Sequence, residues 1–453
     1  MAATTLTPPD VTASDYAEKL AIELGAPSVP GLKSDHPAVA WRRAGVDAIT
    51  GFPDSDPLPA PVALTSAADG ALAVLKSFGS AAGLPTTGAL LLGERARLTG
   101  LTRKGRTAPG GDCHLIDCLD GAIALNLART DDWDLLPAWL EDDGVDDLNS
   151  LQNALAQCSG QEIVERGRAI GLPIALADGI EPTRPWRRLT HFRRREMTER
   201  APVVIDLSSL WAGPLAGQLL VESGATVIKV ESVNRPDGAR RGDPDFYALM
   251  NAGKSSVALD FHNTEDRRVL GALIEKADIV IEGSRPRALR QMGLIAEDWL
   301  SASPGRIWLS ITAYGRRAPE GEWVGFGDDV GVAAGLSRLM RDAYGAFVFV
   351  GDAIADPLTG LHAAAAALAS WRAGGGALLD ISMCGVIQRI IDWDAAQLDR
   401  RDTTVALRAR AEDWRGVMER DDAELYPLRA VHRRKIASLG QDNERIIGDL
   451  HPC

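Results

Sequence analysis

Cysteine is scarce in this sequence of 453 residues, and long apolar runs are absent from it. The cysteines form an odd and sparse set, so we expect no disulfide scaffold and a reducing compartment such as the cytoplasm. No run reaches the roughly 18 apolar residues that a helix needs to cross a bilayer. The first residues also lack the basic start and apolar core of a secretion signal. These absences predict a soluble, cytoplasmic protein with no membrane partner. The cysteines are Cys113, Cys118, Cys158, Cys384 and Cys453.

Several common ligand-binding and catalytic motifs are also missing. Residues 253–255 read Gly-Lys-Ser, but Ala248 stands where a phosphate-binding loop needs its first glycine. The chain has no G-x-G-x-x-G dinucleotide motif after its first β-α-β strand and no G-x-S-x-G hydrolase elbow. Cys113, His114 and Cys118 lie close together, but no second ligand pair follows them. We therefore expect no metal site and interpret these thiols as small buried apolar groups.

Acidic residues outnumber basic ones, 62 against 49, which gives a formal net charge of −13. A field of that sign argues against a general nucleic-acid-binding protein. Hydrophobic residues make up 45% of the chain and charged residues 25%, the profile of a soluble globular protein with a large core. The length predicts two or three domains.

The first 181 residues predict a loop-rich start followed by a mixture of helices and strands. Asp120 and Gly121 form a hairpin turn signal between expected strands at 113–119 and 122–127. The apolar run at 89–93 also has the length and composition of a strand. Helices are expected over residues 71–83, 132–140 and 147–170.

The composition changes at residues 182–200, which hold seven arginines. We interpret this stretch as a solvated linker with a basic face, with contact to an anionic ligand as the alternative. From residue 201, short apolar strands alternate with helices, which predicts an α/β fold with a doubly wound parallel sheet. The expected strands are 203–207, 226–230, 256–260, 279–282, 307–311 and 377–382, and the expected helices are 212–223, 264–277, 286–301 and about 357–373.

Carboxylates at the ends of strands and helices are the remaining candidates for chemistry. Asp356 precedes Pro357 at the start of the alanine-rich helix. It is either the cap of that helix or a nucleophile toward an activated acyl group. Asp328 and Asp329 form a second pair, which we interpret as a solvated turn. A fold of this class binds ligands at the carboxyl ends of its strands, here near residues 208–215.

The order of the motifs across residues 203–383 closely resembles that of the class III CoA-transferases. This is the formyl-CoA and carnitine-CoA transferase (CaiB/BaiF) family, which also includes the α-methylacyl-CoA racemases. The motifs are VIDLSSLWAGPLA (204–216), GATVIKVE (224–231), NAGKSSVALD (251–260), ADIVIEGSRP (277–286), SITAYG (310–315), D-x-x-x-G (356–360) and GGGALLDIS (374–382).

The resemblance extends to other parts of the chain, in an unusual order. Residues 110–125 and the helices up to 176 look like the family's small domain, and residues 438–447 look like its C-terminal stretch. The small domain follows the large one in the family but precedes it here, so we expect a fused or rearranged chain. The expected division is an N-terminal region at 1–181 with a small α+β module at about 85–181, an arginine-rich linker at 182–200, a Rossmann-like large domain at 201–395 and a helical tail at 396–453.

The resemblance implies an enzyme that moves CoA between a CoA thioester and a carboxylic acid. The family's nucleophilic aspartate corresponds to Asp356. It would attack an acyl-CoA to form a mixed anhydride, and the returning thiolate would give an aspartyl-CoA thioester that an acceptor carboxylate then resolves. The implied partners are acyl-CoA, a carboxylic acid and a second copy of the chain, since family members form interlocked dimers. No permanently bound cofactor, metal or ATP is implied.

The family's CoA contacts correspond to the first strand–helix turn, a lysine and a later turn. Gly283 and Ser284 depart from the family's usual Asn-Phe pair, and Thr312 also departs from the pattern of some members. Because the chain is acidic, we expect positive charge for CoA to gather at the arginines of 184–200 and 240–241. The implied CoA-binding positions are Trp211, Ala212, Gly213, Arg240, Arg241, Lys254, Gly283, Ser284, Arg285 and Gly360.

Two other interpretations stay open. The chain could be a catalytically weak relative that serves as a structural or regulatory partner. It could also be a racemase, but that branch of the family needs a His-Asp pair before the helix, to pass a proton across the α-carbon. The corresponding residues 325–330 hold no histidine, and His362 is expected to point elsewhere along its helix.

Overall fold

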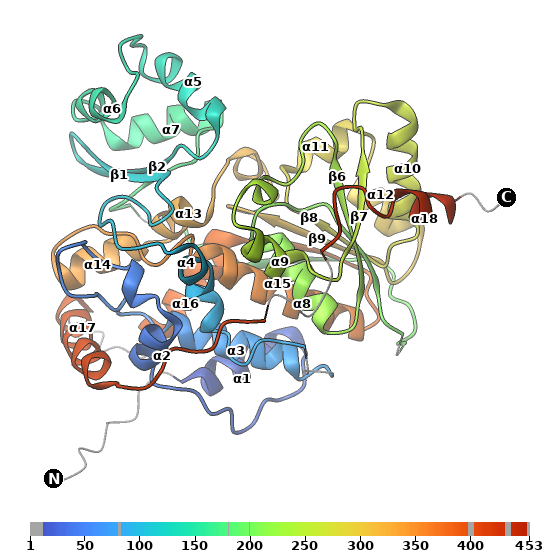
Figure 1. Cartoon of the computed structure of the whole chain (residues 1–453), viewed down its shortest axis with the longest axis horizontal. Helices are drawn as coiled ribbons and strands as arrows, with labels where there is room; N and C mark the ends of the chain where they lie inside the picture. Colours follow the sequence, from blue (N-terminus) through green and yellow to red (C-terminus); the bar gives the residue numbers. More distant parts are fainter. Residues whose placement is uncertain are drawn as a thin grey trace.

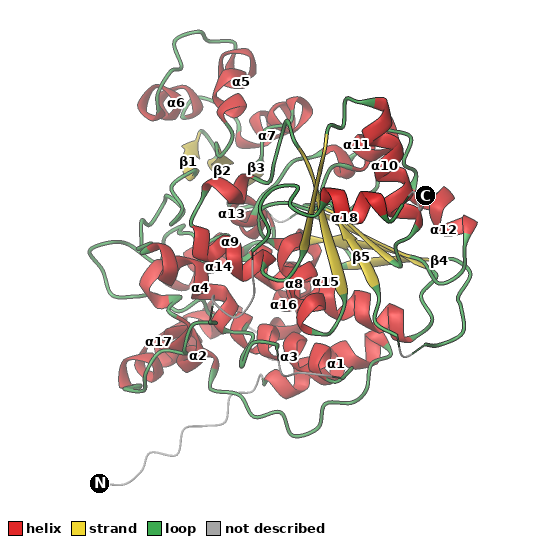
Figure 2. Cartoon of the chain, turned by 45° about the vertical axis from the view of Figure 1, so that its right-hand side comes forward, coloured by secondary structure: helices red, strands yellow, loops and turns green. Residues whose placement is uncertain are grey.

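The computed structural model describes residues 12–79, 83–179, 181–198, 200–396, 403–430 and 436–450. The chain forms a large sheet with helices on both faces and a small sheet with its own helices, which projects beside the large one (Figure 1). Figure 2 shows the strands of the large sheet as a twisted fan between two layers of helices.

The large sheet is doubly wound and almost entirely parallel, as predicted. Its strand order is β4-β10-β9-β8-β5-β6-β7, and β4 alone pairs antiparallel. The chain leaves β5 toward β6 and β7, then returns to β8 and continues outward to β9 and β10, so the winding reverses between β5 and β8. The strands are β4 (Arg187–His191), β5 (Val203–Asp206), β6 (Thr226–Ser232), β7 (Ser255–Leu259), β8 (Ile279–Glu282), β9 (Ile307–Thr312) and β10 (Ala377–Ser382).

Each strand of this sheet supplies apolar side chains to two cores, because successive side chains point to opposite faces. Val204 enters the core that contains α8 and α15, whereas the next residue, Ile205, enters the core on the other face. Ile307 and Trp308 divide in the same way. The first core includes α1 (Ala13–Leu24), α3 (Leu64–Lys76), α8 (Ala212–Glu222), α9 (Pro244–Asn251), α15 (Ala355–Arg372) and α16 (Met383–Ala395), and the second includes α10 (Thr264–Glu275), α11 (Pro286–Gln291), α12 (Ala296–Ala302) and α18 (Asn443–Gly448).

The N-terminal helices belong to the core of the large sheet. In Figure 1 the blue helices α1 and α3 lie beside the orange helix α15. α2 (Pro37–Ala44) and α4 (Leu90–Thr99) pack on each other and share the same core. The strand expected at 89–93 is wrong, since this stretch begins α4. A short leucine run fits a buried helix as well as a strand, and tertiary packing decides between them.

The small sheet has the order β1-β2-β3 and confirms the predicted hairpin, in which Cys118 pairs with Gly121. Its helices cover one face, and α13 (Gly327–Ala333) of the large domain contacts β2 and β3. The helix expected at 147–170 is two helices, separated by residues 156–159. The elements are β1 (Cys113–Cys118), β2 (Gly121–Asn126), β3 (Ile174–Leu176), α5 (Thr130–Leu140), α6 (Leu148–Leu155) and α7 (Gly160–Ile170).

The arginine-rich stretch contains a strand where a linker was expected. Residues 187–191 form β4 at the edge of the large sheet, and the Arg195 guanidinium carbon lies 3.7 Å from the centre of the Trp371 ring. An edge strand tolerates the charged side chains that kept this segment from looking like a strand. Only some of the arginines in this stretch are therefore fully solvated.

The C-terminal part crosses back over the N-terminal helices. α17 (Thr403–Arg420) packs against α2 and α14 (Leu336–Tyr344), as Figure 1 shows at the lower left. Arg429 forms a buried ion pair with Glu94 of α4, and α18 packs on β7. Residues 397–402, 431–435 and 451–453, within the expected tail, lie outside the described residues, and Cys453 is one of them. None of the described helices has the length and apolar character that a membrane crossing requires.

A buried hydrogen bond joins the first helix to α15. The Tyr16 hydroxyl lies 2.6 Å from Nε2 of His362, and Nδ1 of His362 lies 2.6 Å from the carbonyl oxygen of Leu358. Because a carbonyl only accepts, Nδ1 carries the proton and Nε2 accepts from Tyr16. Burial lowers the pKa of His362 to about 3, so the ring is neutral. As predicted, His362 points away from Asp356.

We expect Tyr16→Phe to lower the free energy of unfolding by about 1–3 kcal/mol, because it leaves the buried Nε2 of His362 without a donor. Tyr247→Phe is the matched control, since the buried Tyr247 hydroxyl has no hydrogen-bond partner among the described residues. Urea denaturation of both variants measures the difference. Equal losses would contradict the assigned role of the Tyr16 hydroxyl.

Candidate active site

Asp356 lies where three helices begin. It is in the first turn of α15, which starts at Ala355, with Ile354 at the cap position, so the expectation that Asp356 is the cap is wrong. Its Oδ1 accepts a hydrogen bond of 3.1 Å from the N–H of Ala212, the first residue of α8. The N–H of Gly327, the first residue of α13, also hydrogen-bonds to this carboxylate. Backbone donors from two other helix starts therefore converge on Asp356.

The environment of Asp356 holds its pKa near neutrality. Burial is the main cause and raises the pKa of Asp356 to about 7. The Ala212 and Gly327 N–H groups and the charge of Arg95 oppose this by favouring the carboxylate, whereas Asp352 adds to the increase. Near pH 7 the side chain is thus divided between a neutral acid and a poorly hydrated carboxylate.

Further carboxylates surround this position, and two of them do not form the solvated turn that was expected of Asp328 and Asp329. Asp329 is fully buried rather than in a solvated turn, and its Oδ1 accepts from the Phe326 N–H at 2.9 Å. Burial raises the pKa of Asp329 to about 7. Oδ1 of Asp328 accepts from the Ala353 N–H at 2.8 Å, and burial together with Asp352 raises the pKa of Asp328 well above its usual value.

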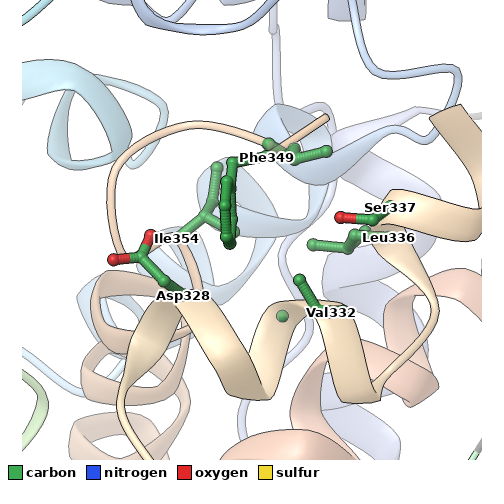
Figure 3. A pocket seen from close by; sticks show the side chains of 8 residues that line it. Asp328, Val332, Leu336, Ser337, Phe349 and Ile354 are labelled. Carbon is green, nitrogen blue, oxygen red and sulfur yellow. The ribbon is translucent and has the colours of Figure 1, made fainter. Parts of the chain in front are cut away.

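A small cavity adjoins this acidic cluster. Figure 3 shows Asp328 and Ile354 on one side of it and Leu336 and Ser337 on the other. Its volume of about 10 Å³ is room for about one water molecule. The cavity is too small for an acyl group, so it does not extend the candidate site.

The N-terminal region supplies side chains that the sequence analysis missed. Nη1 of Arg95, on α4, lies 3.0 Å from Oδ1 of Asp352, and the guanidinium lies over the rings of Trp211 and Phe246. Nδ2 of Asn126, at the end of β2, donates to Asp329 at 3.3 Å. No motif marks these positions, because they are far from Asp356 in sequence and reach it only through the packing of α4 and the small sheet.

The turn between β5 and α8 places its predicted residues beside Asp356. Trp211 and Ala212 are buried, and Trp211 packs edge-on against Phe246 at 5.0 Å between ring centres. A Cβ at Gly213 would stand 2.3 Å from that of Ser208, so this tight turn requires glycine. A Cβ at Gly360 would stand 2.9 Å from the Ala212 carbonyl oxygen. Gly360 thus lets α15 approach the start of α8 closely.

The predicted basic contacts differ in their surroundings. Nζ of Lys254 is buried 2.8 Å from Oδ2 of Asp206 and 2.8 Å from the Pro214 carbonyl oxygen, and burial lowers the pKa of Lys254 to about 8. Arg240 forms an ion pair with Glu231, and Arg241 is exposed at the end of the short 3-10 helix Gly238–Arg241. Lys254 and Arg240 therefore have carboxylate partners within the fold.

The turn after β8 brings Gly283, Ser284 and Arg285 to the point where the winding of the sheet reverses. Arg285 makes no ion pair or hydrogen bond of its side chain within the described part of the chain. Burial lowers its pKa, and so do the charges of Arg287, Arg129 and Arg235, whereas Glu322 raises it. Arg129 and Arg287 form ion pairs with Asp132 and Glu322, so Arg285 differs from them in having no ion pair within the described residues.

A cavity of about 750 Å³ opens next to Arg285, between the small sheet's helix α7 and loops of the large domain. Its volume is in the range of small-molecule sites. Trp323 lies in its wall, with the Arg168 guanidinium carbon 4.3 Å from the ring centre. Other lining residues include Val164, Gly171, Leu176, Glu181, Arg184, Arg287, Glu320 and Ala333. The described residues contain no cluster of side chains that could hold a metal ion.

The fold and the buried carboxylate define a doubly wound α/β domain built around an aspartate at a helix start. Residues 202–416 match the model of CoA-transferase family III, which confirms that this segment is a class III CoA-transferase domain. The matched segment includes β5 to β10 and Asp356.

Curated relatives also match part of the chain. A succinate–glutarate CoA-transferase of Agrobacterium fabrum is 30% identical over 205 residues, 42% of this chain and 51% of that protein. A probable fatty acyl-CoA transferase of Mycobacterium tuberculosis is 33% identical over 215 residues, 46% of this chain and 51% of that protein. A CAIB/BAIF family protein of Brucella suis is 29% identical with a TM-score of 0.39, covering 43% of this chain and 56% of that one. The chain spans about half the length of these relatives.

Asp356→Asn should change how stability depends on pH. Asp356 ionises near pH 7 in the folded protein but near its ordinary value of 3.8 in the unfolded chain. Stability from the neutral carboxyl is complete below pH 3.8 and declines as pH rises to 7, by roughly 1.4 kcal/mol per pH unit. Relative to wild type, the variant's free energy of unfolding should therefore rise between about pH 4 and 7 and level off above.

Urea denaturation across this pH range measures the effect. Asp298→Asn, which changes an exposed aspartate of α12, is the control for the loss of one carboxylate. A constant difference between Asp356→Asn and wild type would contradict the raised pKa of Asp356.

Proposed function

We propose that the protein is an acyl-CoA transferase that moves CoA from a thioester to a carboxylic acid, with Asp356 as nucleophile. The observation that carries the proposal is the buried Asp356 carboxylate, which meets backbone N–H groups of Ala212 and Gly327 within the family III segment. The relatives named as succinate–glutarate and fatty acyl-CoA transferases support the same reaction class.

The proposed chemistry uses only the carboxylate and the substrates. An oxygen of Asp356 attacks the thioester carbonyl carbon, the C–S bond breaks, and CoA leaves as a thiolate with the bonding electrons. The thiolate then attacks the Asp356 carbonyl carbon of the mixed anhydride, which releases the donor acid and leaves an aspartyl-CoA thioester. An acceptor carboxylate repeats the two steps in reverse, so CoA is transferred and Asp356 is regenerated.

The surroundings of Asp356 suit this role for two reasons. A buried carboxylate sheds most of its hydration, which makes it a better nucleophile than one in water. Backbone N–H groups at helix starts stabilise negative charge that develops nearby, without having to reorganise during the reaction. These donors stabilise the carboxylate, and they also stabilise the oxyanion that forms when the carboxylate attacks a thioester.

We place the CoA moiety along the winding reversal between β5 and β8. Arg285, which makes no ion pair within the described residues, is proposed to bind a phosphate group, and the charges of Arg287, Arg129 and Arg235 add to the positive potential at this turn. The neighbouring cavity of about 750 Å³ offers room for the remainder of the ligand. Gly283 and Ser284 are proposed to contact CoA at this turn, whereas Lys254 is proposed to act indirectly by anchoring Asp206 and the β5–α8 turn.

The small sheet lies beside the site within one chain, which suits a complete site in each copy of the protein. A homodimer and a cytoplasmic location remain part of the proposal, on the family resemblance. No specific observation favours the racemase. Among the described residues, no histidine hydrogen-bonds to Asp328, Asp329 or Asp356.

The first test is covalent labelling. Incubation with succinyl-CoA, acetyl-CoA and palmitoyl-CoA, followed by hydroxylamine, should convert Asp356 to its hydroxamate, which peptide mass spectrometry detects. Asp356→Asn should give no product, whereas Asp298→Asn should match wild type. Absence of label with all three thioesters, together with no CoA binding by calorimetry, would favour a structural or regulatory relative. Deuterium uptake at the α-carbon of a 2-methylacyl-CoA would instead indicate a racemase.

The second test concerns the arginines after β8. We expect Arg285→Gln to weaken binding of free CoA by roughly tenfold or more, since it removes a charge-assisted hydrogen bond to phosphate. The loss should shrink as salt is raised. Arg268→Gln, which breaks an exposed ion pair with Glu265, is the control. Unchanged affinity in Arg285→Gln, measured by calorimetry, would place the CoA phosphates elsewhere.

A further inference from the structure

Arg95 is a basic side chain that lies beside the carboxylates of the site but outside the family segment. It projects from α4, in the N-terminal region, and the family model begins only at residue 202. Nη1 donates to both oxygens of Asp352, at 3.0 and 3.1 Å. Asp352 is almost completely buried, whereas the Arg95 side chain keeps 30% of its surface exposed. The remaining guanidinium nitrogens have no hydrogen-bond partner within the described residues.

Arg95 also contacts two aromatic rings, one of which lies next to the start of α8. Its guanidinium carbon lies 5.5 Å from the centre of the Trp211 ring and 5.7 Å from that of Phe246. Trp211 is followed by Ala212, whose N–H binds Asp356. Asp352 belongs to the turn that leads directly into α15 and Asp356. The Arg95 side chain thus contacts Trp211, which precedes the donor Ala212, and Asp352, which lies shortly before the acceptor Asp356.

We propose that Arg95 is a positioning residue for Asp356, which holds the turn before α15 against the start of α8 and supplies positive charge that favours the Asp356 carboxylate. This rests on the proposed function in so far as that carboxylate is the nucleophile. It makes the N-terminal region a part of the site rather than an added module. A transferase segment without α4 would then keep Asp356 but lack this charge.

The charges that face Asp356 come from several elements and do not act in one direction. Arg95 on α4 favours the ionised form, as do the N–H groups of Ala212 and Gly327, whereas Asp352 opposes it. Asp328 on α13 is influenced by both Arg95 and Asp352, and Lys104, which follows α4, acts on Asp352. Removing Arg95 or Asp352 should therefore move the titration of Asp356 in opposite directions.

The test measures this titration directly, without a substrate. Protein labelled with [4-¹³C]aspartate is titrated by NMR, and the Asp356 resonance is assigned from its loss in Asp356→Asn. We expect Arg95→Gln to raise the midpoint by about one pH unit or more, Asp352→Asn to lower it, and Arg95→Lys to stay between wild type and Arg95→Gln. Arg97→Gln, on the same helix and bonded instead to the Tyr426 carbonyl, should leave it unchanged.

A midpoint in folded Arg95→Gln equal to that of wild type would overturn the proposal. If Arg95→Gln does not fold, Asp352→Asn decides, and failure to lower the midpoint overturns it in the same way. Mere loss of packing would not shift the midpoint with opposite signs in the two variants. Because no acyl-CoA is used, an absence of hydroxylamine label at Asp356 would refute the transferase and leave this titration result standing.

Discussion

The structure depends on a meeting of helix starts around one buried carboxylate. α8 and α13 each direct a backbone N–H at Asp356, which itself begins α15. These helices can approach so closely because Gly360 and Gly327 have no Cβ, since one at Gly327 would stand 2.2 Å from Oδ2 of Asp356. Burial makes the acid form favourable and the donors make the carboxylate favourable, and this balance places its ionisation near neutral pH. The nucleophile of the proposed function needs such a balance, because a fully stabilised carboxylate would be unreactive and a fully neutral acid would not attack.

The rest of the fold holds the starts of α8, α13 and α15 close together. The side chains of the alanine-rich α15 are short, so this helix packs against both α8 and the N-terminal α3. Tyr16 binds it from α1, and Arg95 binds the turn before it from α4. The N-terminal helices therefore complete the core of the domain that carries the family motifs, although they precede it in sequence.

Sequence reasoning worked where local pattern and tertiary packing agree. Strands such as β5 and β8 are short apolar runs because both faces of a parallel sheet are buried, and their placement followed directly. Asp356 could be singled out as a candidate because its motif and the start of its helix are local features of the sequence. The predictions for residues 89–93 and for β4 were wrong. A leucine run fits either a helix or a strand, and an arginine-rich edge strand resembles a linker. Arg95 and Asn126 could not be found at all, because their closeness to Asp356 and Asp329 arises only from the folding of distant segments.

The positions of the arginines also decide which of them are available to the anionic CoA of the proposed function. Those expected to gather charge are largely engaged: Arg184 pairs with Glu181 and Glu320, and Arg240 pairs with Glu231. A paired arginine offers little to a phosphate, because binding would have to displace its carboxylate. Arg285 differs, since its neighbours Arg287, Arg129 and Arg235 repel it. The proposed CoA site thus lies at the winding reversal of the sheet, where folds of this class bind ligands.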